Sequence, residues 1–253
     1  MRLLSLAAVL GPGLLAGLSD DDPAGITTYS VLGAQHGYQL LWVLLLSTVA
    51  LVVFHSLGAR VGVVTGQGLI GLIRQRYGVG PAALAISALV VANLGTTCAE
   101  FAGIAAGFEL FGVTRYVAVP VAALVVSVLV LRGGFHRVEH ILMGLATVFV
   151  AYIAAGFLSH PHWGQAFKGL VVPTMPLTRD AVLIATATIG TTLAPWGLSF
   201  IQSYAVDKKL TAADLGYERI DVVTGAVLTG VIGFFVVVSC AATLHAQGVT
   251  IES

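Results

Sequence analysis

The sequence predicts an all-α integral membrane protein with about seven transmembrane helices. Of its 253 residues, 57% are hydrophobic and only 9% are charged, whereas about 25% of the residues in a soluble domain are charged. The mean hydropathy of +0.96 is therefore too high for one soluble core, and the excess apolar surface must face lipid. Lysine and arginine balance aspartate and glutamate at 12 each, so we expect the lipid bilayer and no nucleic acid as a partner.

Seven stretches are apolar and long enough to span a bilayer, which takes about 20 residues or fewer when a helix is interrupted. They cover about 3–35, 40–54, 81–110, 117–131, 141–158, 181–206 and 222–244. The stretch 58–78 is amphipathic instead, and it contains Gly66, Gly68 and Gly71 at the GxGxxG spacing of dinucleotide-binding loops. Because no strand is predicted before it, we interpret this stretch as a helix on the membrane surface.

The basic residues predict a cytoplasmic N-terminus in the cytoplasmic membrane. Cytoplasmic ends of membrane proteins carry an excess of lysine and arginine. With the N-terminus inside, the outer ends carry only Arg115, Lys168 and Arg179. The inner ends then carry Arg2, Arg60, Arg74, Arg76, Arg132, Arg137, Lys208, Lys209 and Arg219.

Two of the apolar segments contain a matched interruption. The first reads Ser-Asp-Asp-Asp-Pro-Ala-Gly over 19–25, and the sixth reads Gly-Thr-Thr-Leu-Ala-Pro-Trp-Gly over 190–197. Proline removes a backbone donor, and the nearby glycine relaxes the local dihedral angles. Unwound backbone at membrane depth is tolerated only where it is buried in protein or lines a cavity. Helices one and six are therefore predicted to be discontinuous, with freed carbonyls that can coordinate a cation.

Carboxylates inside the apolar segments are the candidate ion ligands. Asp22 directly precedes the proline of the first interruption, and Glu100 lies in the third segment. Glu100 has the alternative role of hydrogen bonding to a neighbouring helix, and Asp20 and Asp21 are interpreted as either vestibule groups or helix caps. Carboxylates, carbonyls and retained water suit hard divalent cations. We therefore expect a divalent metal ion as the substrate, and no bound cofactor.

Several motifs resemble those of the Nramp family of divalent-metal transporters. They are Gly11-Pro12-Gly13, the Asp22-Pro23 break, and the runs over 37–42, 63–68 and 96–103. The resemblance implies a LeuT-like fold with two inverted five-helix repeats and the metal between helices one and six. On this basis 1–253 is a single transmembrane domain, with about 1–159 as the first repeat and about 178–253 as the start of the second. The last three helices of a ten-helix core are missing, so we expect a truncated chain.

The departures from the family pattern concern the metal ligands. The usual Asp-Pro-Gly-Asn reads Asp22-Pro23-Ala24-Gly25, and the usual Met-Pro-His reads Ala194-Pro195-Trp196. The changes remove a soft thioether that favours transition metals and a histidine associated with proton traffic. Both changes resemble the Nramp-related magnesium transporters. That resemblance implies Mn²⁺ and/or Mg²⁺ as the ion, with Fe²⁺ as a further candidate, and no proton coupling.

The resemblance also assigns positions of this chain to the metal site. The principal residues are Asp22 and Glu100 through their carboxylates, and Thr191 and Ala194 through backbone carbonyls. Further candidates are Asp20, Asp21, Gly25 and Gln202. For Gln202 the alternative is a hydrogen bond between helices.

Other functions fit parts of the sequence less well. His136, Glu139 and His140 match the HxxEH pattern of inverted zincins, but no third acidic ligand is evident, so we do not expect an enzyme. The histidines at 160 and 162 are interpreted as surface residues rather than a metal trap. A LeuT-type Na⁺-coupled transporter of a small organic solute is the alternative function. Three aspartates at the break would repel a solute carboxylate. No protein partner is predicted.

Overall fold

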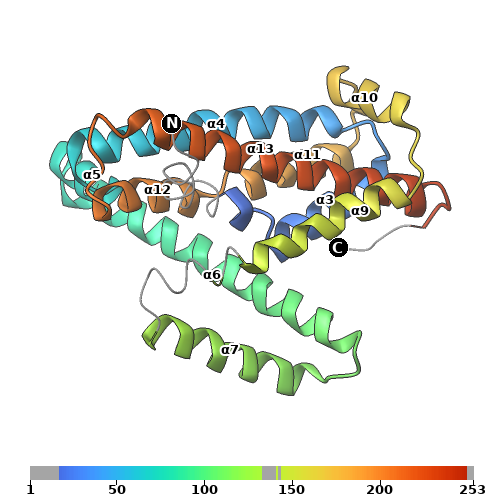
Figure 1. The fold of residues 1–253 in the computed structure, drawn as a ribbon, viewed down its shortest axis with the longest axis horizontal. Coiled ribbons are helices and arrows are strands. Elements are labelled where there is room, and N and C mark those ends of the chain that lie inside the picture. Colours follow the sequence, from blue (N-terminus) through green and yellow to red (C-terminus); the bar gives the residue numbers. More distant parts are fainter. Residues whose placement is uncertain (1–16, 133–140, 142–143, 250–253) are drawn as a thin grey trace, which may run out of the picture.

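The computed structural model describes residues 17–132, 141 and 144–249, and every regular element in this part of the chain is helical (Figure 1). The elements in chain order are α3 (Pro23–His36), α4 (Leu41–Thr65), α5 (Leu69–Tyr77), α6 (Val79–Glu109), α7 (Arg115–Arg132), η1 (Thr147–Phe149), α9 (Val150–Leu158), α10 (Trp163–Val171), α11 (Arg179–Thr192), α12 (Pro195–Asp207), α13 (Leu215–Cys240) and the π-helical turn η2 (Ala241–His245). The predicted all-α class is confirmed.

Five helical stretches are long and apolar enough to cross a membrane. They are α4, α6, α7, the pair α11 and α12 over Arg179–Asp207, and α13 with η2 over Leu215–His245. Gly144–Leu158 and α10 meet at a bend of 116°, and they make a sixth only if the bent pair is counted as one span. The second half of the first predicted segment is α3, and residues 1–16 of that segment lie outside the described part of the chain.

The C-terminal end of the second segment lies further along the chain than predicted. We expected the segment to end near Phe54, but α4 continues to Thr65 and ends at Gly66, whose φ of 61° caps the helix. The prediction was wrong because His55, a polar residue in an apolar run, is buried inside the protein instead of marking a membrane boundary. Only α5 remains as a separate helix in the stretch predicted to lie on the surface, and a helix, not a strand, precedes the glycine motif.

The core lies between α13, α4 and α3, with α11 and α12 packed against α4 (Figure 1). Buried Tyr29 and Leu32 of α3 meet Leu44 of α4 and Val237 of α13 in one cluster. Close backbone approach accounts for the tight fit of α12 on α4. A Cβ added to Gly62 would lie 2.5 Å from the carbonyl oxygen of Gln202.

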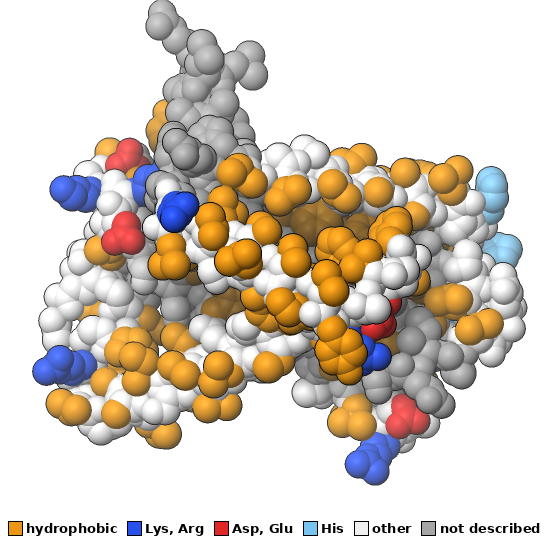
Figure 2. Space-filling model, turned by 90° about the horizontal axis from the view of Figure 1, so that it is seen from below, with side chains coloured by type: hydrophobic (Ala, Val, Ile, Leu, Met, Phe, Trp, Pro, Cys, Tyr) orange, Lys and Arg blue, Asp and Glu red, His pale blue; other side chains and the backbone are white. Residues whose placement is uncertain are grey.

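Helices α6 and α7 form a hairpin at one side of this core (Figure 1). Their apolar side chains are largely uncovered, with Leu84, Val91 and Leu124 exposed by 74%, 69% and 65%. Figure 2 shows a face on which hydrophobic side chains predominate and charged ones are few. Contiguous apolar surface of this extent is unusual on a soluble monomer, and it identifies a multi-pass membrane protein.

Candidate metal site at the two helix breaks

The first predicted break is present, and Asp22 begins the helix that follows it. A helical turn ends at Ser19, the backbone is non-helical over 20–22, and α3 starts at Pro23. The Asp22 carboxylate accepts a hydrogen bond of 2.6 Å from the backbone N–H of Gly25. This is the geometry of an aspartate N-cap followed by proline at the first helical position.

The second predicted break has the same construction. Helix α11 ends at Thr192, Ala194 is extended with φ −62° and ψ 132°, and α12 starts at Pro195. The N-terminal ends of α3 and α12 therefore both lie at breaks. Each such end carries a partial positive charge, which favours burial of the aspartates at the first break.

The two breaks meet in space. A Cβ added to Gly25 would lie 2.6 Å from the carbonyl oxygen of Asp20 and 3.6 Å from Oγ1 of Thr191. One turn further on, the hydroxyls of Tyr29 and Thr192 lie 3.0 Å apart. Thr191 and Gly25 are thus brought together, as expected for one site, by the packing of α3 on α11.

Glu100 of α6 lies beside Asp22 in the lining of one cavity. The two carboxyl groups lie within hydrogen-bonding reach of each other. Gly103 makes this approach possible, because any Cβ there would overlap the ring of Pro23. The cavity has a volume of about 680 Å³, and Asp21, Asp22 and Glu100 line it. Two carboxylates this close repel unless a proton or a cation lies between them.

Asp20 and Asp21 are also buried, each with only 2% of its surface exposed. None of their four carboxylate oxygens has a hydrogen-bond partner among the described residues. Asp21 faces the cavity with Glu100. Asp20 lies on another side, with Oδ1 3.9 Å from the point where a Cβ of Gly197 would stand. The consecutive aspartates therefore have different surroundings.

The remaining candidates lie in two places. The Ala194 carbonyl, at the second break, accepts a hydrogen bond of 3.1 Å from the N–H of Gly197. Gln202 is two turns further along α12, and its amide donates to the carbonyl of Gln67 at 3.0 Å. The structure thus gives Gln202 a hydrogen bond to the connector between α4 and α5, and not the helix-to-helix bond considered as the alternative. In the described ranges, no three His, Cys, Asp or Glu side chains are arranged to hold a metal.

Sequence reasoning missed His55 of α4. This imidazole is 2% exposed, and its Nε2 lies 3.1 Å from the position of a Cβ on Gly197. Its only sequence signal was a single histidine in an apolar run.

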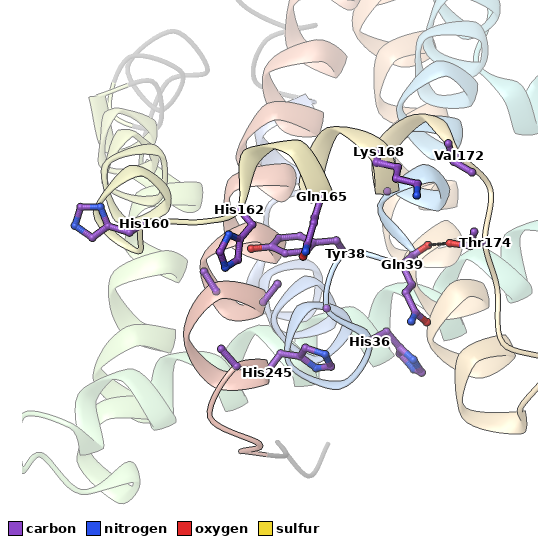
Figure 3. A pocket seen from close by; sticks show the side chains of 15 residues that line it. His36, Tyr38, Gln39, His160, His162, Gln165, Lys168, Val172, Thr174 and His245 are labelled. Carbon is purple, nitrogen blue, oxygen red and sulfur yellow. Dashed lines mark hydrogen bonds between the residues drawn. The ribbon is translucent and has the colours of Figure 1, made fainter.

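A second cavity, of about 470 Å³, lies among α3, α10 and η2 (Figure 3). Both His160 and His162 line it with His36 and His245, and the ring Nδ1 of His245 lies 2.9 Å from the carbonyl of Ala34. Its lining includes a lysine and no acidic residue within the described chain, which disfavours a cation. The HxxEH motif at 136–140 lies outside the described residues.

Comparisons with known proteins identify relatives of this chain. The chain is 31% identical to the divalent metal cation transporter MntH of Erwinia tasmaniensis over 252 residues, which are 95% of this chain and 60% of that protein. The MntH of Ralstonia nicotianae is 34% identical over 251 residues, 94% of this chain and 56% of that protein. The chain thus spans little more than half the length of these curated relatives.

A crystal structure of the Eremococcus coleocola manganese transporter, with a bound aromatic bis-isothiourea compound, has the same fold. The TM-score is 0.77 at 22% identity, over 98% of this chain and 52% of that one. The described residues therefore have the LeuT-like fold of such transporters, in incomplete form. The family model for natural resistance-associated macrophage protein-like sequences matches residues 13–253. The chain therefore belongs to the Nramp family.

Proposed function

We propose that this chain is part of a secondary transporter that carries divalent metal cations across the cytoplasmic membrane. The ion would bind between the break at 20–22 and the break at Ala194. Family membership and the names of the relatives, which are divalent metal cation transporters, support the substrate class. These relatives are transporters and not enzymes, and we expect the same of this chain.

The observation that carries the proposal is the meeting of Asp22 and Glu100 beside buried, unpartnered Asp21. Burying several carboxylates without partners is costly, and intramembrane acids usually mark an ion pathway. A divalent cation between them would supply the missing counter-charge. The carbonyls of Thr191 and Ala194 would add oxygen ligands from the second break.

The proposed ion is Mn²⁺ or Mg²⁺. The Asp22 and Glu100 carboxylates, the backbone carbonyls and retained water make an oxygen-rich site, which suits Mg²⁺ and Mn²⁺. Ala194 offers no thioether, so the site has no soft ligand at that position. The manganese transporter of similar fold supports Mn²⁺, and the resemblance to the magnesium branch supports Mg²⁺. Uncoupled transport is part of the same proposal, because tryptophan occupies position 196.

An Asp22→Asn variant separates the charge of this residue from its capping role. Asparagine caps helices as well as aspartate does, so α3 should form normally. Uptake of Mn²⁺ and Mg²⁺ into proteoliposomes should fall at least about tenfold, since even outer-shell changes cost 10–100-fold in metal affinity. The internal pH, followed by a trapped dye, should stay constant during uptake by the wild type.

Three results would count against the proposal. Full uptake by Asp22→Asn would remove the residue from the site. Acidification during Mn²⁺ uptake, with no entry of Mg²⁺, would indicate ordinary proton-coupled transport. The absence of any metal flux in correctly folded protein would refute the transport function itself.

A further inference from the structure

The first turn of α12 brings Asp20 and His55 together at a glycine. A Cβ on Gly197 would lie 3.1 Å from His55 Nε2 and 3.9 Å from Asp20 Oδ1. The imidazole comes from α4 and the carboxylate from the first break, so three separate elements converge at this point. A side chain at position 197 would therefore lie close to both groups.

These two groups are separate from the Asp22 and Glu100 pair. The cavity beside α6 is lined by Asp21 and Asp22, whereas Asp20 faces α12. The course of the backbone through the first break explains why the side chains of Asp20 and Asp22 point in different directions. Backbone N–H groups of Asp20 and Asp21 bond back to Gly17 and Leu18, while the Asp22 carbonyl already accepts the first bond of α3. Successive side chains therefore leave the break in different directions.

Both groups are buried, and most of their polar atoms lack a hydrogen-bond partner in the described part of the chain. Asp20 and His55 are each 2% exposed. Both oxygens of Asp20 and the Nδ1 of His55 have no hydrogen-bond partner in the described part of the chain. The N-terminal end of α12 supplies only a partial positive charge. A cation held by Asp20 and the imidazole would complete this arrangement.

We propose that Asp20 and His55 form a mixed oxygen and nitrogen cation site next to Gly197, and that His55 determines which divalent ion the transporter prefers. This inference rests on the proposed function. Imidazole binds later transition-metal ions, whereas Mg²⁺ takes oxygen ligands almost exclusively. His55 therefore restores, from α4, a preference for transition metals that the thioether missing at position 194 cannot give.

Dissociation constants for Co²⁺ and Mg²⁺, measured on the purified protein in lipid nanodiscs, test the inference. His55→Gln keeps a polar side chain and removes the imidazole. Gly197→Ala keeps the Asp20 carboxylate and the His55 imidazole and places a methyl group close to both. Gly190→Ala is the matched control, because a Cβ at position 190 would meet nothing within 4 Å. Thermal unfolding of each variant reports whether the fold is retained.

We expect His55→Gln and Gly197→Ala each to weaken Co²⁺ binding about tenfold or more. Mg²⁺ binding should change by less than about threefold, because oxygen ligands remain. Gly190→Ala should change neither constant.

Unchanged Co²⁺ binding in both variants would overturn the inference and leave Asp20 and His55 as buried groups with no role in ion binding. An equal loss of Co²⁺ and Mg²⁺ would also overturn it, because His55 would then only support the local structure. Wild-type protein that binds neither ion would refute the proposed function as well. Binding of both ions with the same ratio in every variant would refute this inference alone.

Discussion

Asp22 has two roles at the residue scale, since its carboxylate caps α3 and also faces Glu100. The residues after it explain why the asparagine of the family motif cannot be restored by a single change. A Cβ at position 25 would lie 2.6 Å from the carbonyl oxygen of Asp20. The first turn of α3 thus sits closer to the break than a side chain at position 25 permits. Glycine at this position is a structural requirement of the present geometry.

Ala194 gives a residue-scale prediction about metal preference. Ala194→Met introduces a thioether at the second break, and soft ligands favour soft ions. We expect Cd²⁺ to compete for the site about tenfold better than in the wild type, an estimate based on typical effects of metal-site changes. Inhibition of Mn²⁺ uptake by Cd²⁺ is the measurement. Ala187→Met serves as the control, because Ala187 is exposed on α11 away from the break.

A thioether at position 194 that leaves Cd²⁺ inhibition unchanged would show that this position does not face the ion. The same gain in Ala187→Met would assign the effect to nonspecific binding of Cd²⁺ by methionine.

Sequence reasoning selected the acids of the candidate site because carboxylates stand out in an apolar segment. Asp22 and Glu100 are far apart in sequence, yet each could be selected by its own cost of burial. His55 could not be found in this way. One histidine at the end of an apolar run resembles a membrane boundary, and its proximity to Gly197 depends on how α12 packs on α4.

At the element scale, the close approach of α6 to the start of α3 holds the two carboxyl groups together. Gly103 provides this approach, because a side chain there would collide with Pro23. Gly107, one turn later on α6, has no atom within 4 Å of its Cβ position. The two glycines are therefore a natural pair of test and control positions.

Gly103→Ala should push α6 away from α3 and separate Glu100 from Asp22. We expect a loss of stability of about 1–3 kcal/mol, as is typical of overpacking, together with weaker Mn²⁺ binding. Gly107→Ala should keep wild-type stability and binding. The two variants are compared by chemical unfolding and by Mn²⁺ titration, and equal behaviour of both would contradict the proposed packing role of Gly103.

The positions of the helix breaks followed from proline and glycine, whose effect on the backbone is local. The end of α4 could not be predicted in the same way. Hydropathy placed it near Phe54, whereas the helix continues to Thr65 because its C-terminal turns pack against α12. Local chemistry therefore predicted the interruptions, and tertiary packing decided the helix length.

At the scale of the whole molecule, the orientation in the membrane stays a prediction of the basic residues. Helices α5 and α10 lie toward opposite ends of the long axis (Figure 1). Gln75 of α5 and Gln165 of α10 are both exposed glutamines, so they make a matched pair for labelling. The division into repeats at about 159 and 178 likewise stays a prediction.

Single cysteines at these two positions test the orientation in intact cells, after Cys98 and Cys240 have been replaced. An impermeant maleimide should label Gln165→Cys from outside and should label Gln75→Cys only after permeabilisation. The opposite pattern would place the N-terminus outside, because three predicted segments, over 81–110, 117–131 and 141–158, separate the two helices.

The central claim, that a divalent cation binds between the two helix breaks, is tested most directly by locating the ion. Crystals of the protein grown with Mn²⁺ would give an anomalous difference peak at the manganese absorption edge. We predict a peak within about 2.0–2.6 Å of an Asp22 carboxylate oxygen, the range of divalent cation to oxygen distances in proteins, and its loss in Asp22→Asn. A peak only in the histidine-lined cavity of Figure 3, or one that persists unchanged in Asp22→Asn, would contradict the account.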